Sequence, residues 1–392
     1  MVYALGFAFL GYNYSKMPTV KHIVIDARIR RSSTGRYVAR LLDHLQTIDT
    51  FHRYTVLLQP DDDWQPTAAN FHPVPCRYPQ FSFNPFNEIG FATQLTQLKP
   101  DLVHFTMTQQ PLTYFGEIVT TTHDLTMFRF VRRGKTSKPL FALKMFLYRF
   151  LMKWSHMKSD KIIVPTKYVA ADLAAYQPST KHKIVVTYEA GDLPENVGAP
   201  HKPIGISPKD EFIMYLGTAF PHKNLPRLVE AFEILKQKHP KLKLVLVGKK
   251  EIHYKELEDF IRSKPHAKDI LVTGFLPDEE TKWLYEHALA YVIPSLSEGW
   301  GLPALEAMGY GAPVVSSNAT CLPEVYGDAA HYFNPENPKD IAQKVSEVIG
   351  NKILRDQLAR NGRAQLKKYS WHTMAEETLI VYKEILEETI NA

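Results

Sequence analysis

The sequence predicts an α/β protein built from two doubly wound domains. Short, almost continuously apolar segments alternate with amphipathic helical segments, which indicates parallel sheets covered on both faces. This alternation stops once, at residues 191–208, where GDLPENVGAPHKPIGISP is rich in proline and glycine and has no apolar periodicity. The length of 392 residues also exceeds the usual size of one hydrophobic core.

The first domain is expected over residues 21–190, after an N-terminal extension of residues 1–20. Its opening strand is HIVIDA, followed by the polar loop RIRRSSTG and the amphipathic helix RYVARLLDHL. The later strands are YTVLL, DLVHFT, IVTTTHD, KIIVPT and KIVVTYEA. The extension lacks the basic region and cleavage site of a secretory signal, so we expect residues 1–16 to be dispensable.

The second domain is expected over residues 209–370, after the linker at 191–208. Its predicted strands are FIMYLG, KLVLVG, DILVTG and AYVIPS, separated by helical segments. Residues 371–392 predict a long terminal amphipathic helix. Because doubly wound sheets bind ligands at the carboxyl ends of their strands, we expect a site in the cleft between the domains.

Composition excludes several classes of protein. Hydrophobic residues make up 45% and charged residues 22%, as in ordinary globular proteins. The net charge of +6 suits phosphate-bearing ligands or an anionic membrane surface, and no basic stripe indicates nucleic acid. Cys76 and Cys321 are far apart, which argues against a disulfide framework or zinc site. No window reaches the about 18 apolar residues of a membrane span, so we do not expect an integral membrane protein. The two isolated cysteines fit a reducing cytoplasm, where we expect the protein to lie.

The segment PSLSEGWGLPALE, residues 294–306, carries the clearest chemical signal. A buried strand leads into a glycine-bearing loop, and Pro303 stands where a helix would begin. The amides before it are therefore free to bind an anion, and the helix dipole adds ~0.3–1 kcal/mol for each favourably placed charge. A diphosphate suits this position. The amides concerned are those of Gly299, Trp300, Gly301 and Leu302.

Two carboxylates accompany this loop. Glu298 lies within it, and Glu306 lies about one turn into the helix, so the two would contact hydroxyl groups on different parts of one ligand. Taken singly, Glu306 reads as a surface helix carboxylate and the glycines as turn residues. The combination favours a ligand site.

The same segment resembles the glutamate-x7-glutamate motif of retaining glycosyltransferases of the GT-B fold. The resemblance is to family 4, the glycosyl transferases group 1, in its mannosyltransferase-like members, and it extends from Ile23 to about Leu386. It implies a nucleotide diphosphate sugar as substrate and no cofactor. It also implies that Glu306 binds the nucleotide ribose and that Glu298 contacts the donor sugar.

The segment MYLGTAFPHKN resembles the family's phosphate-binding loop, with Lys223 on the family's lysine. Its ammonium would act as a point charge on the leaving diphosphate, the electrostatic work otherwise done by a metal, and no metal is expected. Thr218 and His222 stand where many relatives have arginine. Binding of the phosphates would therefore be weaker, or would depend on a basic residue outside this motif.

Three further segments resemble parts of the family's cleft. TTTHDL carries His123 and Asp124, a pair that lines the acceptor side near the donor sugar, although a histidine after a strand is also a common structural residue. SSTGRY resembles the family's first glycine loop, with Ser33 and Thr34 replacing the first pair. Gly35 would allow close approach of the donor, or would simply cap a turn. LVTGF, with Gly274, resembles the wall around the nucleobase.

Two segments invite other interpretations. Asp61-Asp62-Asp63 could suggest metal-binding carboxylates, but it lies in the polar turn QPDDDWQP and we expect a solvated loop. The basic, apolar segment KPLFALKMFLYRFLMKWSHMKSDK is expected to be a helix packed at the domain edge. Its alternative role is peripheral attachment to the inner face of a membrane.

The family resemblance implies transfer of a hexose to a growing glycan or lipid-linked acceptor by front-face displacement. The leading donors are GDP-mannose and UDP- or ADP-linked hexoses such as glucose. Glu298, Lys223 and His123 are the expected catalytic residues. Three alternatives remain: an epimerase or a phosphorylase on the same scaffold, and a non-catalytic nucleotide-sugar-binding subunit, which the changes at Ser33 and Thr218 keep open.

Overall fold

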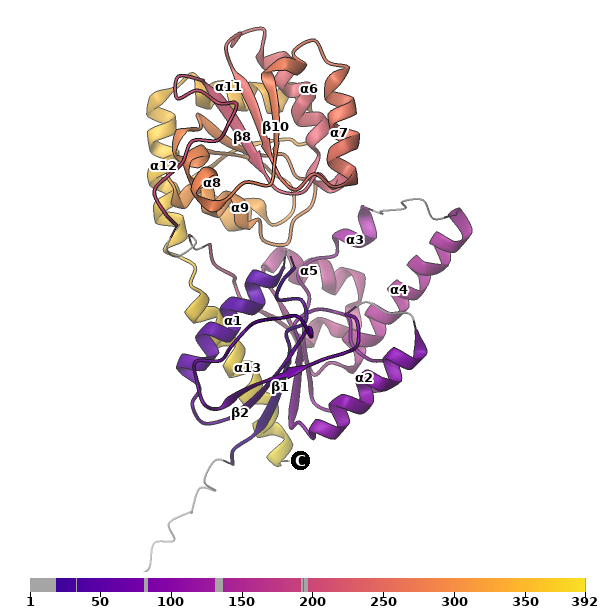
Figure 1. Ribbon diagram of the computed structural model, residues 1–392. Coiled ribbons are helices and arrows are strands. Elements are labelled where there is room, and N and C mark those ends of the chain that lie inside the picture. The colour runs from indigo at the N-terminus through magenta and orange to yellow at the C-terminus, as the bar shows by residue number, and fades with distance from the viewer. Residues whose placement is uncertain are drawn as a thin grey trace, which may run out of the picture.

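The computed structural model describes residues 19–32, 34–80, 84–130, 137–191, 193 and 197–391. The expected dispensable extension, residues 1–16, and Ser33 lie outside this description. Within it, the chain forms two α/β domains, each built on one parallel sheet, that face each other (Figure 1). The prediction of two doubly wound domains is confirmed.

The first domain contains a seven-stranded sheet of order β3-β2-β1-β4-β5-β6-β7. Strand β3 was not predicted, because FHPVP contains two prolines, which are tolerated only where a strand forms the edge of a sheet. The strands are β1 (His22–Asp26), β2 (Arg53–Leu58), β3 (Phe71–Pro75), β4 (Leu102–Phe105), β5 (Ile118–Thr121), β6 (Lys161–Val164) and β7 (Ile184–Val186).

Helices cover both faces of this sheet (Figure 1). They are α1 (Gly35–Ile48), α2 (Pro85–Leu98), α3 (Thr126–Arg129), α4 (Lys138–Lys158), α5 (Lys167–Tyr176) and the 3₁₀ helix η1 (Pro178–Lys183). The expectation that α4 packs at the domain edge holds only for its C-terminal half, where Met152, Ser155 and His156 are buried. Large apolar side chains are exposed in the first part of the helix and at its middle, among them Phe146 and Phe150.

The second domain contains a six-stranded sheet of order β10-β9-β8-β11-β12-β13. The last two strands, of four residues each, were not predicted. The strands are β8 (Phe212–Leu216), β9 (Lys243–Val247), β10 (Ile270–Gly274), β11 (Ala290–Ile293), β12 (Val314–Ser317) and β13 (Ala330–Phe333). The helices are α6 (Leu225–Leu235), α7 (Ile252–Arg262), α8 (Asp278–His287), α9 (Leu302–Gly309), α10 (Leu322–Tyr326), α11 (Pro338–Ile349) and α12 (Lys352–Leu366), with the 3₁₀ helices η2 (Pro221–Lys223), η3 (Ala267–Asp269) and η4 (Gly327–Ala329).

The terminal helix α13 (Trp371–Asn391) returns to the first domain and lies beside α1 (Figure 1). Trp371, Met374 and Tyr382 belong to the same buried cluster as Leu41 and Leu45 of α1. The core of the first domain is therefore completed by residues that follow the second domain in the chain.

In both sheets the strand order reverses beside the first strand of the domain. In the first sheet β1 lies between β2 and β4, and in the second β8 lies between β9 and β11. At such a switch point the loops leave in opposite directions and open a crevice at the carboxyl ends of the strands. Loops at the carboxyl ends of strands from both sheets line one common cavity. None of the described helices is both long enough and apolar enough to cross a lipid bilayer.

Candidate active site

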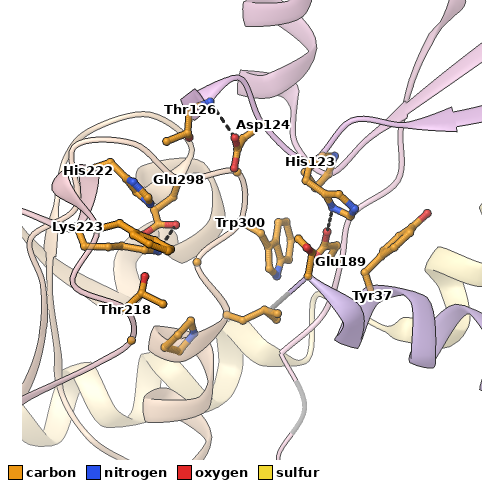
Figure 2. Close-up of a pocket in the computed structure, with 18 of the residues that line it drawn as sticks. Tyr37, His123, Asp124, Thr126, Glu189, Thr218, His222, Lys223, Glu298 and Trp300 are labelled. Carbon is orange, nitrogen blue, oxygen red and sulfur yellow. Dashed lines mark hydrogen bonds and ion pairs between the residues drawn. The ribbon is translucent and has the colours of Figure 1, made fainter. Parts of the chain in front are cut away.

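A cavity of about 390 Å³ lies between the two domains (Figure 2). The first domain contributes Thr34, Tyr37 and the residues after β5, and the second contributes the loops after β8 and β11. Ten of the residues predicted from the sequence line it: His123, Asp124, Thr218, His222, Lys223, Glu298, Gly299, Trp300, Gly301 and Leu302.

The loop before α9 depends on its two glycines. Gly301 caps the helix with a φ of +93°, a left-handed conformation that glycine adopts at no steric cost. A β-carbon on Gly299 would lie 2.1 Å from the carbonyl oxygen of His123, so the two domains touch here. The first amide bonded within the helix is that of Ala304, which donates to Gly301 at 3.2 Å. The amides before it therefore have no acceptor within the helix.

Lys223 and Glu298 are in direct contact inside the cavity (Figure 2). The ammonium donates to both carboxylate oxygens, at 2.7 and 2.9 Å. Burial disfavours the charged carboxylate, but the adjacent Lys223 outweighs it and holds the pKa of Glu298 below its ordinary value. Glu298 is therefore an ionised acceptor for hydroxyl groups.

The position of Lys223 is set by its neighbour Asn224. Asn224 adopts a left-handed conformation with φ of +60°, and its side-chain amide donates to the carbonyls of Pro294 and Pro335 at 2.9 and 2.8 Å. Because Pro294 follows β11, these bonds hold the loop after β8 against the end of β11. The lysine and the glutamate are thus brought together by their backbones.

Glu306 is buried and bridges the domains. Arg36 at the start of α1 forms an ion pair with one of its oxygens, and the Tyr285 hydroxyl lies 3.4 Å from the other. The interpretation of Glu306 as a surface carboxylate is therefore wrong. Arg36 was not predicted as a site residue, although this arginine follows Gly35 in the motif that resembles the family's first loop.

His123 and Asp124 form the opposite wall (Figure 2). The ring of His123 lies 3.3 Å from a Glu189 oxygen through Nδ1 and 3.0 Å from the Thr106 carbonyl through Nε2. Asp124 accepts the Thr126 amide at 2.8 Å. Glu189 was not predicted as a site residue, because the segment YEAG indicates only the end of a strand. Only the spatial proximity of a histidine reveals its role.

The remaining predicted residues take different positions. The Thr218 carbonyl accepts the Tyr215 hydroxyl at 2.9 Å, and the ring of His222 stacks on Phe220. Gly35 and Gly274 are not among the residues that line the cavity. A β-carbon on Gly35 would lie 1.8 Å from the Arg30 carbonyl oxygen, so the glycine is required by close packing of the chain on itself.

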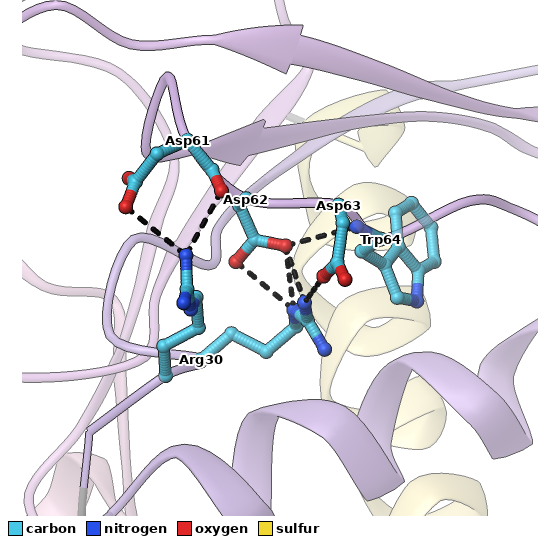
Figure 3. Close-up of polar contacts among 6 residues, drawn as sticks. Arg30, Asp61, Asp62, Asp63 and Trp64 are labelled. Atoms are coloured by element: carbon cyan, nitrogen blue, oxygen red, sulfur yellow. Dashed lines mark hydrogen bonds and ion pairs between the residues drawn. The ribbon is translucent and has the colours of Figure 1, made fainter.

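The three consecutive aspartates form ion pairs with two arginines (Figure 3). Asp62 pairs with Arg30 and accepts the amide of Trp64 at 3.0 Å, while Asp61 pairs with Arg31 at 3.0 Å. The prediction of a solvated loop is wrong for Asp62, whose side chain is 1% exposed, because the loop after β1 supplies the arginines. Among the described residues, no group of three or more histidine, cysteine or acidic side chains is arranged to hold a metal ion.

Two family models match consecutive parts of the chain. Residues 34–193 match Glycosyltransferase Family 4, and residues 199–365 match Glycosyl transferases group 1. The chain belongs to the family 4 glycosyltransferases. Lys223, Glu298 and Glu306 lie in the region that matches group 1, and His123 and Arg36 lie in the region that matches family 4.

Several known proteins are similar to this chain. The O-antigen chain mannosyltransferase B of Escherichia coli is 34% identical over 176 residues, which is 44% of this chain and 45% of the relative. The serotype-specific mannosyltransferase WbdA of Escherichia coli is 28% identical over 258 residues, 64% of this chain and 29% of the relative. These alignments thus span less than half the length of either relative.

The solved structure of sucrose-phosphate synthase from Thermosynechococcus elongatus superposes with a TM-score of 0.74 at 15% identity. It covers 94% of this chain and 100% of that one. The family match together with this likeness confirms the predicted GT-B fold for this chain.

Proposed function

We propose that this protein is a retaining glycosyltransferase that moves a hexose from a nucleotide diphosphate sugar to a glycan or lipid-linked acceptor. One observation carries the proposal: the N-terminus of α9 opens into the interdomain cavity beside the Lys223–Glu298 pair. Amides and ammonium suit a diphosphate, and an ionised carboxylate suits sugar hydroxyls.

The donor would extend along α9. Its diphosphate would lie at the amides from Gly299 to Leu302 and near Lys223, and its ribose would reach Glu306. Arg36, already beside Glu306, is our candidate for the second cation that the loop after β8 lacks. His123 and Asp124 would then face the donor sugar and the acceptor from the first domain.

The reaction would break the bond between the anomeric carbon and the diphosphate oxygen. A bond from the same carbon to the acceptor oxygen forms on the same face, and the acceptor's proton passes to the leaving phosphate. Charge grows on the leaving oxygen during this step, where the helix N-terminus and Lys223 stabilise it most.

We propose GDP-mannose as the first donor to test, because relatives of this chain are named mannosyltransferases. UDP- and ADP-glucose are the alternatives. The full chain is mixed with each nucleotide sugar, and a donor that binds the folded protein raises its melting temperature. The donor that binds is then incubated with lipid-linked and glycan acceptors, and NMR reads the anomeric configuration of the product.

Each outcome decides between functions. Transfer with retained configuration supports the proposal, whereas an inverted product overturns its stereochemistry. Binding with neither sugar transfer nor donor hydrolysis indicates a nucleotide-sugar-binding subunit. Conversion of the free donor to its epimer indicates an epimerase. If no nucleotide sugar binds, the proposal fails.

We also propose that the enzyme acts at the inner, cytoplasmic face of a membrane, attached through α4. The helix contains no acidic residue, and its exposed apolar side chains include Leu143, Phe146 and Phe150. Exposed basic side chains on the same helix are those of Lys144, Arg149 and Lys153. This combination suits an anionic bilayer, where apolar burial and charge attraction act together.

Flotation with liposomes tests this attachment. We expect the full chain to float with anionic vesicles at low salt and not with neutral vesicles. Changing Phe146 and Phe150 to serine should abolish flotation, whereas Ile353→Ser, at an even more exposed apolar residue of α12, should not. Absence of flotation with anionic vesicles at low salt would refute attachment.

A further inference from the structure

The two hydrogen-bond partners of His123 determine its charge. The Thr106 carbonyl, 3.0 Å from Nε2, can only accept, so Nε2 must carry a proton. The Glu189 side chain lies 3.3 Å from Nδ1 and, as a carboxylate, accepts, so Nδ1 carries a proton as well. A ring protonated on both nitrogens is an imidazolium.

His104, a second buried histidine of the same sheet, provides the contrast. Its ring nitrogens lie 2.5 Å from the Tyr382 hydroxyl and 2.8 Å from the Thr121 hydroxyl. A hydroxyl can donate as well as accept, so this ring needs only one proton. Burial lowers the pKa of His104 to about 3, and this ring is neutral at physiological pH. The charge of His123 therefore follows from its partners, because burial alone would make both rings neutral.

We propose that Glu189 is a positioning residue that holds His123 as an imidazolium, and that the locked ring fixes the acceptor-side wall of the cavity. Glu189 is itself buried, and it follows β7 in the segment that leads along the chain to the second domain. The ring connects that segment to the loop after β4, which carries Thr106, and to the loop after β5, which carries Asp124. Figure 2 shows the contact between Glu189 and His123.

The other charged and titratable groups around the ring are consistent with this assignment. Asp124 lies next to it in sequence and favours its positive charge, and the ring of Tyr37 from α1 meets it edge-on with centroids 5.0 Å apart. Burial opposes the charge of His123, but Glu189 outweighs burial, and the pKa of His123 is raised. From the second domain, the paired Lys223 and Glu298 and the ring of His222 line the same cavity.

This arrangement determines what His123 does in the proposed reaction. Both N–H groups of the ring already donate to oxygens of the protein. The ring therefore does not take a proton from the hydroxyl of the sugar acceptor. When the ring loses a proton at high pH, a lone pair on Nδ1 faces the Glu189 carboxylate. The contact then breaks and the wall loosens, so Glu189 sets the alkaline limit of activity.

Long-range proton–nitrogen NMR of the full chain tests the charge directly. At pH 7.5 we expect the His123 nitrogens, identified by their loss in His123→Asn, to show an imidazolium, and those of His104 to show a neutral ring. This measurement needs no transferase activity, so it remains decisive if the proposed function is wrong. A neutral His123 in the wild type at that pH would overturn the inference.

Glu189→Gln separates charge from structure. The glutamine amide can donate to Nδ1 of a neutral ring, so the geometry is kept while the imidazolium loses its partner. We expect the NMR signal at pH 7.5 to become that of a neutral ring, and the alkaline limb of kcat to move about one to three pH units lower. Donor KM should change little, because Glu189 lies on the acceptor side.

The matched control is Glu256→Gln, because Glu256 pairs with His253 at 3.1 Å on the exposed side of α7. It should leave the pH profile unchanged. An unchanged alkaline limb in Glu189→Gln, alongside a wild-type imidazolium, would overturn the positioning role.

Discussion

Lys223 and Glu298 are joined by two hydrogen bonds of 2.7 and 2.9 Å, although 75 positions separate them in the chain. One follows β8 and the other follows β11, and these strands are neighbours in the second sheet. Their carboxyl ends therefore meet at one point. The pair concentrates a positive and a negative group beside the free amides of α9.

Removing either partner should lower turnover strongly. We expect Lys223→Met and Glu298→Gln each to reduce kcat by about 10²–10³-fold, the usual cost of losing one preorganised charged or hydrogen-bonding group. The double variant should lose less than the product of the two effects, because the residues act as a unit. Lys249→Met, at an exposed lysine of the same domain, is the control. Additive losses would contradict coupling between the two residues.

The same pair should make stability depend on acid pH. The pKa of Glu298 is lower in the folded protein than its ordinary value of about 4.3. Its contribution is therefore fully present above that value and is lost as the pH falls through the folded pKa. Urea unfolding of the wild type and Glu298→Gln between pH 3 and 7 should show a stability difference that shrinks on the acid side. A difference independent of pH would contradict the assigned ion pair.

Glu306 should act mainly in donor binding. Replacing it with glutamine removes a charged acceptor for the ribose, and a hydrogen bond to a charged group contributes about 1.5–3 kcal/mol. We therefore expect donor affinity to fall about 10–100-fold in calorimetry, with kcat at saturating donor nearly unchanged. Glu336→Gln, at an exposed glutamate of the same domain, should bind as the wild type does. Unchanged affinity in Glu306→Gln would remove the ribose assignment.

The terminal helix should stabilise the first domain. The Tyr382 hydroxyl lies 2.5 Å from Nδ1 of His104, and both side chains are fully buried. Tyr382→Phe leaves the His104 nitrogen without this partner and should cost about 1–3 kcal/mol in denaturant unfolding. Hydrogen exchange should rise in β4 rather than in the second sheet, and Lys383→Ala on the exposed face should change neither. Loss of protection in the second domain alone would contradict this packing.

The sequence by itself predicted both parallel sheets apart from strands β3, β12 and β13. It also predicted the loop before α9, with Glu298 in that loop and Glu306 in the helix. These features are local: apolar periodicity reports burial within one strand or helix, and a glycine or proline constrains its own backbone. The amides of α9, the lysine after β8 and the histidine after β5 could be assigned because each lies within a few residues of a strand end.

Only the tertiary structure decided which groups meet. Arg36 pairs with Glu306, His123 with Glu189 and Asp62 with Arg30, and α13 completes a core that begins before residue 50. Each partner comes from a distant segment, and charge, burial and protonation state depend on that partner. No pattern within a short stretch of chain contains this information, because the contacts arise only when the two sheets and their loops are folded against each other.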